Sequence, residues 1–173
     1  MPPRMELPVP ADEASTRTLE GRTGALTNAL CAGLSAYALY WVLFIVQPQV
    51  YRVSFLLVAL VLTFLLFPAR RRDSPVIARG DWVLVALTVV ALAWPLVDFR
   101  AFIYRSTDPT PLDVALGVAA VLLVLEAARR SVGWILPVTA AAFLVYAYAG
   151  PVFDRIGLPL LAHRGYGVER LAG

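Results

Sequence analysis

The sequence offers little material for catalysis. Histidine, the commonest general base, occurs once, at His163, and cysteine occurs once, at Cys31. A single cysteine excludes an intrachain disulfide and a Cys-x-x-Cys metal site, and no His, Cys, Asp and Glu residues have the spacing of metal ligands. His163 is typical of a solvent-exposed tail residue and Cys31 of a small buried hydrophobe. We therefore expect no enzyme activity, no metal site and no cofactor.

One carboxylate and two guanidinium groups are spaced to meet on a single helical face. Arg129 and Arg130 follow Glu126 by three and four residues, the spacings at which helical side chains are neighbours. Charges near membrane depth are costly unless they are paired, so we predict that Glu126 is ion-paired with Arg129 or Arg130. Two interpretations stay open: a basic anchor at the membrane surface with a local ion pair, and a fixed contact to another helix or subunit.

A second acidic residue marks the start of the same helix. Thr110 is a good N-cap, Pro111 suits the first helical position, and Asp113 falls three residues after the cap. Asp113 also suits the positive end of the helix dipole, as Arg129 and Arg130 suit the negative end. A helix over residues 111–130 would be about 30 Å long, enough to cross the hydrocarbon core of a bilayer.

Two glycines after this helix predict where the chain turns and where the next helix ends. Gly133 allows a tight turn, and only a few residues separate Arg130 from Trp134, so the helices on either side are expected to form a close hairpin. Gly150 and Pro151 are expected to end the second helix of this hairpin.

The elements that must position these residues are membrane helices. Hydrophobic residues make up 60% of the 173 residues and charged residues 16%, against roughly 45–50% and 25% in soluble domains. A spanning helix needs about 20 mainly apolar residues. We therefore predict an all-α integral membrane protein of about five transmembrane helices. The predicted spans lie near residues 26–47, 53–68, 82–98, 111–130 and 134–150.

Charge patterning predicts how these spans are oriented. The formal net charge of +3 comes from arginine alone, and in an apolar chain this favours arginines flanking spans rather than a nucleic-acid partner. The cluster Arg70-Arg71-Arg72 directly beside a span places the N-terminus in the cytoplasm. Residues 1–24, rich in proline, are then a disordered cytoplasmic tail. Residues 152–173 form an extracytoplasmic loop or interfacial tail that is expected to continue in a longer permease.

The segment from Asp113 onward also carries a family resemblance. Its motif residues are Asp113, Gly117, Leu125-Glu126-Ala127-Ala128-Arg129-Arg130, Gly133, Leu136-Pro137, Tyr146, Gly150, Leu158-Pro159 and His163-Arg164-Gly165. This pattern resembles the N-terminal part of the fused permeases of tripartite ATP-independent periplasmic (TRAP) transporters, of the TAXI type in particular. Upstream, the Asp81-Trp82 pair that opens the third apolar run agrees with it. The resemblance covers roughly residues 25–170.

The resemblance implies a role in transport. Such permeases take up small organic anions by symport, driven by an ion gradient that is usually of sodium. A periplasmic substrate-binding protein feeds them, and the small part of the permease is a scaffold for a large permease subunit or domain. It implies that this chain lies in the lipid bilayer of a bacterial inner membrane. No substrate or sodium ligand can be carried over, because the large part is not in this sequence.

Three other readings remain. The chain is, on a second interpretation, the small membrane subunit of another multi-subunit carrier, such as a tripartite tricarboxylate system. A structural or assembly protein of the membrane, without any transport role, has the same apolar composition. An intramembrane enzyme is the weakest reading, because the sequence has no catalytic constellation.

Overall fold

The structure is a computed structural model that describes residues 16–17, 19–44, 47–69, 77–97, 99, 103, 110–155 and 167, with 151–155 described by their backbone alone. This part of the chain holds five helices and no strand, which confirms the predicted all-α fold. The helices are α1 (Gly21–Leu43), α2 (Pro48–Leu66), α3 (Arg79–Val97), α5 (Pro111–Ser131) and α6 (Ile135–Arg155).

Four of these helices, α1, α2, α3 and α5, are long and apolar enough to cross a membrane. The chain is therefore a multi-pass membrane protein by the length and composition of its helices. The apolar section of α6 is shorter and covers Ile135–Gly150, so a fifth crossing stays a prediction. The expected spans match these helices with shifted ends.

One clear shift is at the connection between the first two helices. The predicted first span ended at residue 47, but α1 ends at Leu43 and α2 already begins at Pro48. Charge-free length could not locate this turn, because it lies inside one uncharged run from Thr23 to Tyr51. The available signal was Pro48 itself, which occupies the first turn of α2, where a missing N–H costs no helical hydrogen bond.

The prediction that Gly150 and Pro151 end the last helix is wrong. The helix α6 continues through both residues to Arg155. Proline inside a helix removes one hydrogen bond, and its ring crowds the carbonyl group four residues back, but the result can be a kink rather than a helix end. The remaining tail, including His163, lies outside the described residues except for Gly167.

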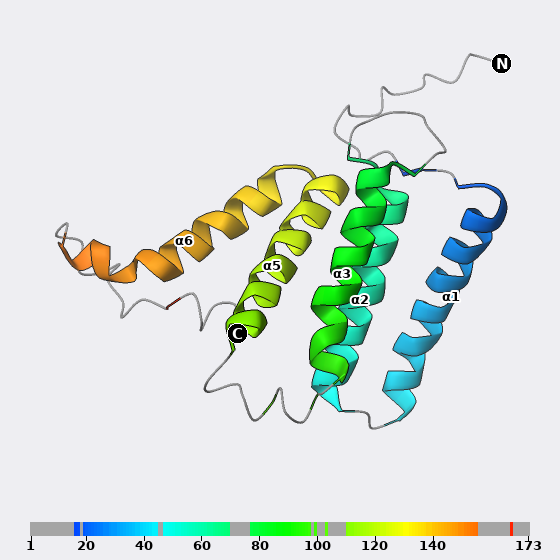
Figure 1. Cartoon of the computed structure of the whole chain (residues 1–173), viewed down its shortest axis with the longest axis horizontal. Coiled ribbons are helices and arrows are strands. Elements are labelled where there is room, and N and C mark those ends of the chain that lie inside the picture. Colours follow the sequence, from blue (N-terminus) through cyan, green and yellow to red (C-terminus); the bar gives the residue numbers. More distant parts are fainter. Residues whose placement is uncertain are drawn as a thin grey trace, which may run out of the picture.

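Three helices form the core. Side chains of α2, α3 and α5 pack together, and the buried members are Leu60, Phe64, Ala91, Leu92, Leu123 and Ala127. The other two helices flank this core on opposite sides, with α1 next to α2 and α6 next to α5 (Figure 1). Successive helices along the chain from α1 to α5 alternate in direction, so α1 and α3 begin at the end of the bundle at which α2 and α5 finish (Figure 1).

The connection between α5 and α6 is tight, as predicted. Gly133 has φ of +97°, a left-handed conformation that suits glycine, and its N–H donates to the Arg129 carbonyl oxygen at 3.2 Å. The expected close hairpin does not follow from this turn. The two helices diverge from it, and α6 points away from the core (Figure 1). Large side chains of α6 are exposed, among them Ile135, Phe143 and Val145.

Candidate functional site

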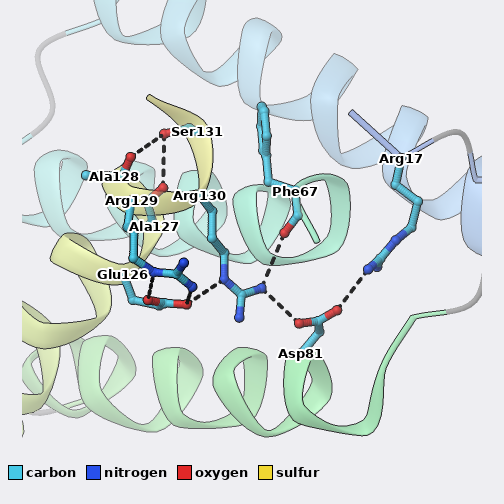
Figure 2. Close-up of polar contacts among 9 residues, drawn as sticks. All are labelled: Arg17, Phe67, Asp81, Glu126, Ala127, Ala128, Arg129, Arg130 and Ser131. Atoms are coloured by element: carbon cyan, nitrogen blue, oxygen red, sulfur yellow. Dashed lines mark hydrogen bonds and ion pairs between the residues drawn. The ribbon is translucent and has the colours of Figure 1, made fainter. Parts of the chain in front are cut away.

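A cluster of five charged residues lies at one end of the core, where α2 and α5 finish and α3 begins. We call Arg17, Asp81, Glu126, Arg129 and Arg130 the charged cluster (Figure 2). Its members come from the segment before α1, from the first turn of α3 and from the last turns of α5. The end of the bundle that holds them is called the cluster end below.

Asp81 is the centre of the charged cluster. One of its carboxylate oxygens, Oδ2, accepts from Arg17 Nη2 at 3.0 Å, and the other, Oδ1, accepts from Arg130 Nη1 at 2.8 Å. All three side chains are 5% exposed or less. A buried charge is tolerated only when partners replace the lost hydration, and here each oxygen of the carboxylate has its own guanidinium.

Glu126 extends the cluster along α5. Arg129 donates to both of its carboxylate oxygens, each at 2.7 Å, and Arg130 Nε donates to its Oε1 at 2.8 Å. The ion pairing expected from the spacing is therefore present with both arginines. Arg129 and Glu126 are about a quarter exposed, whereas Arg130 is buried, so the pair with Arg130 is the less hydrated of the two.

The arginines of the cluster also satisfy the end of α2. The last carbonyl groups of a helix have no partner within it, and α2 has no basic residue in its last turn. Arg17 Nη1 donates to the Leu65 carbonyl oxygen at 3.2 Å, and Arg130 Nη1 donates to that of Phe67 at 3.3 Å. These cations lie at the negative end of the α2 dipole, which favours them.

Aromatic rings complete the surroundings of the two α5 arginines. The Arg130 guanidinium lies 5.2 Å from the centre of the buried Phe64 ring, and that of Arg129 lies 5.3 Å from the Trp134 ring. Both distances are within the range of cation–π attraction. Trp134 is mostly exposed, so the pair of Arg129 and Trp134 marks the outer edge of the cluster.

Asp113 lies at the opposite end of α5 and makes a separate polar site. Its side chain accepts from the Thr110 N–H at 3.0 Å and from the Thr110 hydroxyl at 2.6 Å, completing the capping box. Trp94 Nε1 of α3 donates to Asp113 Oδ1 at 2.9 Å. The predicted N-cap is confirmed, and it also links α5 to α3.

Sequence reasoning named three of the five cluster residues and missed the roles of the other two. Glu126, Arg129 and Arg130 are paired by local spacing. Asp81 was identified only as part of a motif, and Arg17 was not singled out. The available signal was a carboxylate two residues inside an apolar helix, which requires a partner, but nothing in the sequence identifies that partner.

The geometry of the charged cluster indicates a structural role, in which ion pairs join neighbouring helices. Each carboxylate is flanked by two guanidinium groups, and arginine does not give up its proton at any ordinary pH. The cluster therefore holds charges in place and has no free group poised for proton transfer. Among the described residues, no group of His, Cys, Asp and Glu could hold a metal ion. Comparison with protein-family models, with curated proteins and with solved structures gives no match.

Proposed function

We propose that this chain is the scaffold part of a TRAP-type permease, as a small subunit or as the N-terminal part of a fused chain. Together with a large permease part and a periplasmic binding protein, it would take up small organic anions with a sodium gradient. The basis is the segment from Leu125 to Gly133 together with Asp81-Trp82, whose residue pattern resembles that family.

The observation that supports a scaffold role is the use made of these same residues. Asp81 and Arg130, from the two parts of the pattern, join α3 to α5 and to the end of α2. They are buried and mutually neutralised, so their contribution is to fix helices relative to one another. A transport site needs polar groups that converge near the middle of the membrane, commonly at broken helices. The cluster instead lies at helix ends.

The divergence of α6 supports a large partner. A helix that leaves its bundle with apolar side chains exposed on several sides needs lipid or protein around it. Small residues at helix surfaces let another helix approach closely, and α6 presents such a surface in the run from Thr139 to Ala142. We infer that a helix of the large permease part packs there.

We further propose that the cluster end faces the cytoplasm of a bacterial inner membrane. The described arginines at this end include Arg17, Arg22, Arg79, Arg129 and Arg130, and flanking arginines favour the cytoplasmic side. Reporter fusions after Arg72, Thr107, Ser131 and Gly173 test this. Fusions after Arg72 and Ser131 should report cytoplasm, and the other two should report the outside; cytoplasmic activity at Gly173 would show that α6 does not cross.

The proposal is tested by purification and reconstitution. The chain should co-purify with a large multi-span permease encoded beside it. Liposomes containing both and supplied with the binding protein should take up labelled dicarboxylates or amino acids only with a sodium gradient. Sodium-driven uptake by this chain alone would overturn the scaffold role. Co-purification with a tricarboxylate-type carrier, or with an assembly factor in place of a permease, would favour one of the two alternative functions.

A further inference from the structure

Among the described residues before α1, Arg17 is hydrogen-bonded to the core through both its backbone and its side chain. The backbone N–H of Arg17 donates to the Leu66 carbonyl oxygen at 2.7 Å, while its guanidinium reaches Leu65 and Asp81. These partners lie 48 to 64 positions away along the chain. Figure 2 shows the Arg17 side chain entering the charged cluster from the side opposite to the α5 residues.

The Arg17 guanidinium donates hydrogen bonds to two oxygen atoms. They are the carboxylate oxygen Oδ2 of Asp81 and the carbonyl oxygen of Leu65, both turned toward the guanidinium. Each binds one of the two terminal nitrogens. A planar guanidinium can serve two such acceptors at once, whereas an ammonium group is a point charge without this fixed geometry.

The receiving site is also held by groups other than Arg17. Asp81 Oδ1 is held by Arg130, and the Leu65 carbonyl belongs to the last turn of α2. Within the described part of the chain, Arg17 Nε is the buried side-chain nitrogen that has no hydrogen-bond partner. Binding therefore involves only the terminal end of the Arg17 side chain, which a small guanidinium ion reproduces.

We propose that Asp81 and the end of α2 form a guanidinium-binding site, and that Arg17 occupies it as a latch that holds the start of α1 against the core. The site takes guanidinium cations, from this chain's own arginine or from a free ion. It does not depend on the proposed transport role.

The first turns of α1 pack closely against the segment that contains Arg17. Gly24 packs so closely against the preceding backbone that a Cβ atom there would collide with the Leu19 carbonyl group. Gly24 and Thr27 are the buried residues of α1, and both lie in its first two turns. Toward its other end, α1 contacts α2 through Tyr37 and Trp41. Release of Arg17 is therefore expected to loosen the first turns of α1 and to leave its far end in place.

Amide hydrogen exchange of residues 16–24 measures the latch directly, in the full chain reconstituted in phosphatidylcholine nanodiscs. Arg17→Ala should speed exchange of this segment by about tenfold or more, because local opening of the segment no longer requires an ion pair to be broken. Arg22→Ala is the matched control, since Arg22 is exposed on the first turn of α1, and it should leave exchange near the wild-type rate.

Chemical rescue tests the ligand class. Millimolar guanidinium chloride, far below denaturing concentrations, should raise the thermal stability of Arg17→Ala toward that of the wild type, because the ion fills the site beside Asp81 that the substitution vacates. Ammonium chloride at equal concentration should not. Adding Asp81→Asn to Arg17→Ala should abolish the rescue. Equal rescue by both salts, no rescue by guanidinium, or rescue that survives Asp81→Asn would each overturn the proposal.

A second variant keeps the test decisive if Arg17→Ala does not fold. Arg17→Lys retains the positive charge but cannot present two fixed donors to two acceptors. Exchange of residues 16–24 should rise in this variant, because lysine cannot serve both acceptors of the site at once. Wild-type exchange in Arg17→Lys without any added salt would show that only a positive charge is required, which would overturn the guanidinium site.

Discussion

The two ends of the helix bundle stabilise their buried carboxylates in different ways. At the cluster end, Asp81 depends on arginines from two distant elements. At the other end, Asp113 accepts from Thr110 within its own helix start and from Trp94 of α3. Loss of the first carboxylate leaves two buried cations without their shared partner, whereas the Thr110 and Trp94 donors at the second carboxylate are neutral. The ends should therefore differ strongly in their sensitivity to substitution.

The largest effect is expected from Asp81→Asn. This change leaves Arg17 and Arg130 buried beside a neutral amide, and breaking a buried ion pair from one side costs about 3–5 kcal/mol. We expect a marked loss of membrane yield and of thermal stability in detergent. Glu20→Gln removes an equal charge from an exposed position next to α1 and should change neither. Equal losses in the two variants would show that burial at Asp81 does not matter.

Glu126→Gln should have an intermediate effect. Glu126 is partly exposed, but it neutralises the buried Arg130, and hydrogen bonds to charged groups contribute about 1.5–3 kcal/mol. The free energy of unfolding should fall, and association with a large permease part should weaken. In a double-mutant cycle with Arg130→Gln the two losses should overlap by about 0.5–3 kcal/mol. Strict additivity would contradict a coupled pair.

Asp113→Asn should cost less than either change in the charged cluster. The amide oxygen can still accept from Thr110, but the amide nitrogen then faces the Trp94 N–H. We therefore expect a weaker cap and the loss of the Trp94 hydrogen bond, each of about 1 kcal/mol. Thermal unfolding in detergent would measure the combined loss. Asp113→Ala, which removes the acceptor altogether, should be more destabilising; if the two substitutions had equal effects, the capping box would not be the source of stability.

The smallest effect is expected from Trp94→Phe. The ring remains, but the hydrogen bond to Asp113 is lost, at a cost of about 0.5–1.5 kcal/mol. Trp82→Phe alters a tryptophan of similar exposure in the first turns of the same helix and is the control for loss of an indole. The difference between the two variants in unfolding free energy gives the contribution of the link between α3 and α5. No difference would show that Asp113 needs only its own helix.

The features that the sequence predicts well are those decided over short distances along the chain. The capping box of Thr110 and Asp113 and the ion pairs of Glu126 need only positions three or four residues apart on one helix. The tight turn at Gly133 is equally local. Where local signals competed, prediction failed, since Pro151 indicated a helix end and the helix continues past it.

The amino-acid sequence by itself determined that this is a helical membrane protein, because apolar runs of sufficient length have few other stable forms in lipid. It also determined which charges pair along α5. Only the tertiary structure decided that Asp81 joins Arg17 and Arg130, which lie 64 and 49 positions away. The physical reason is that the end of α2 and the start of α3 create the unsatisfied acceptors, and these meet the arginines only after the helices pack.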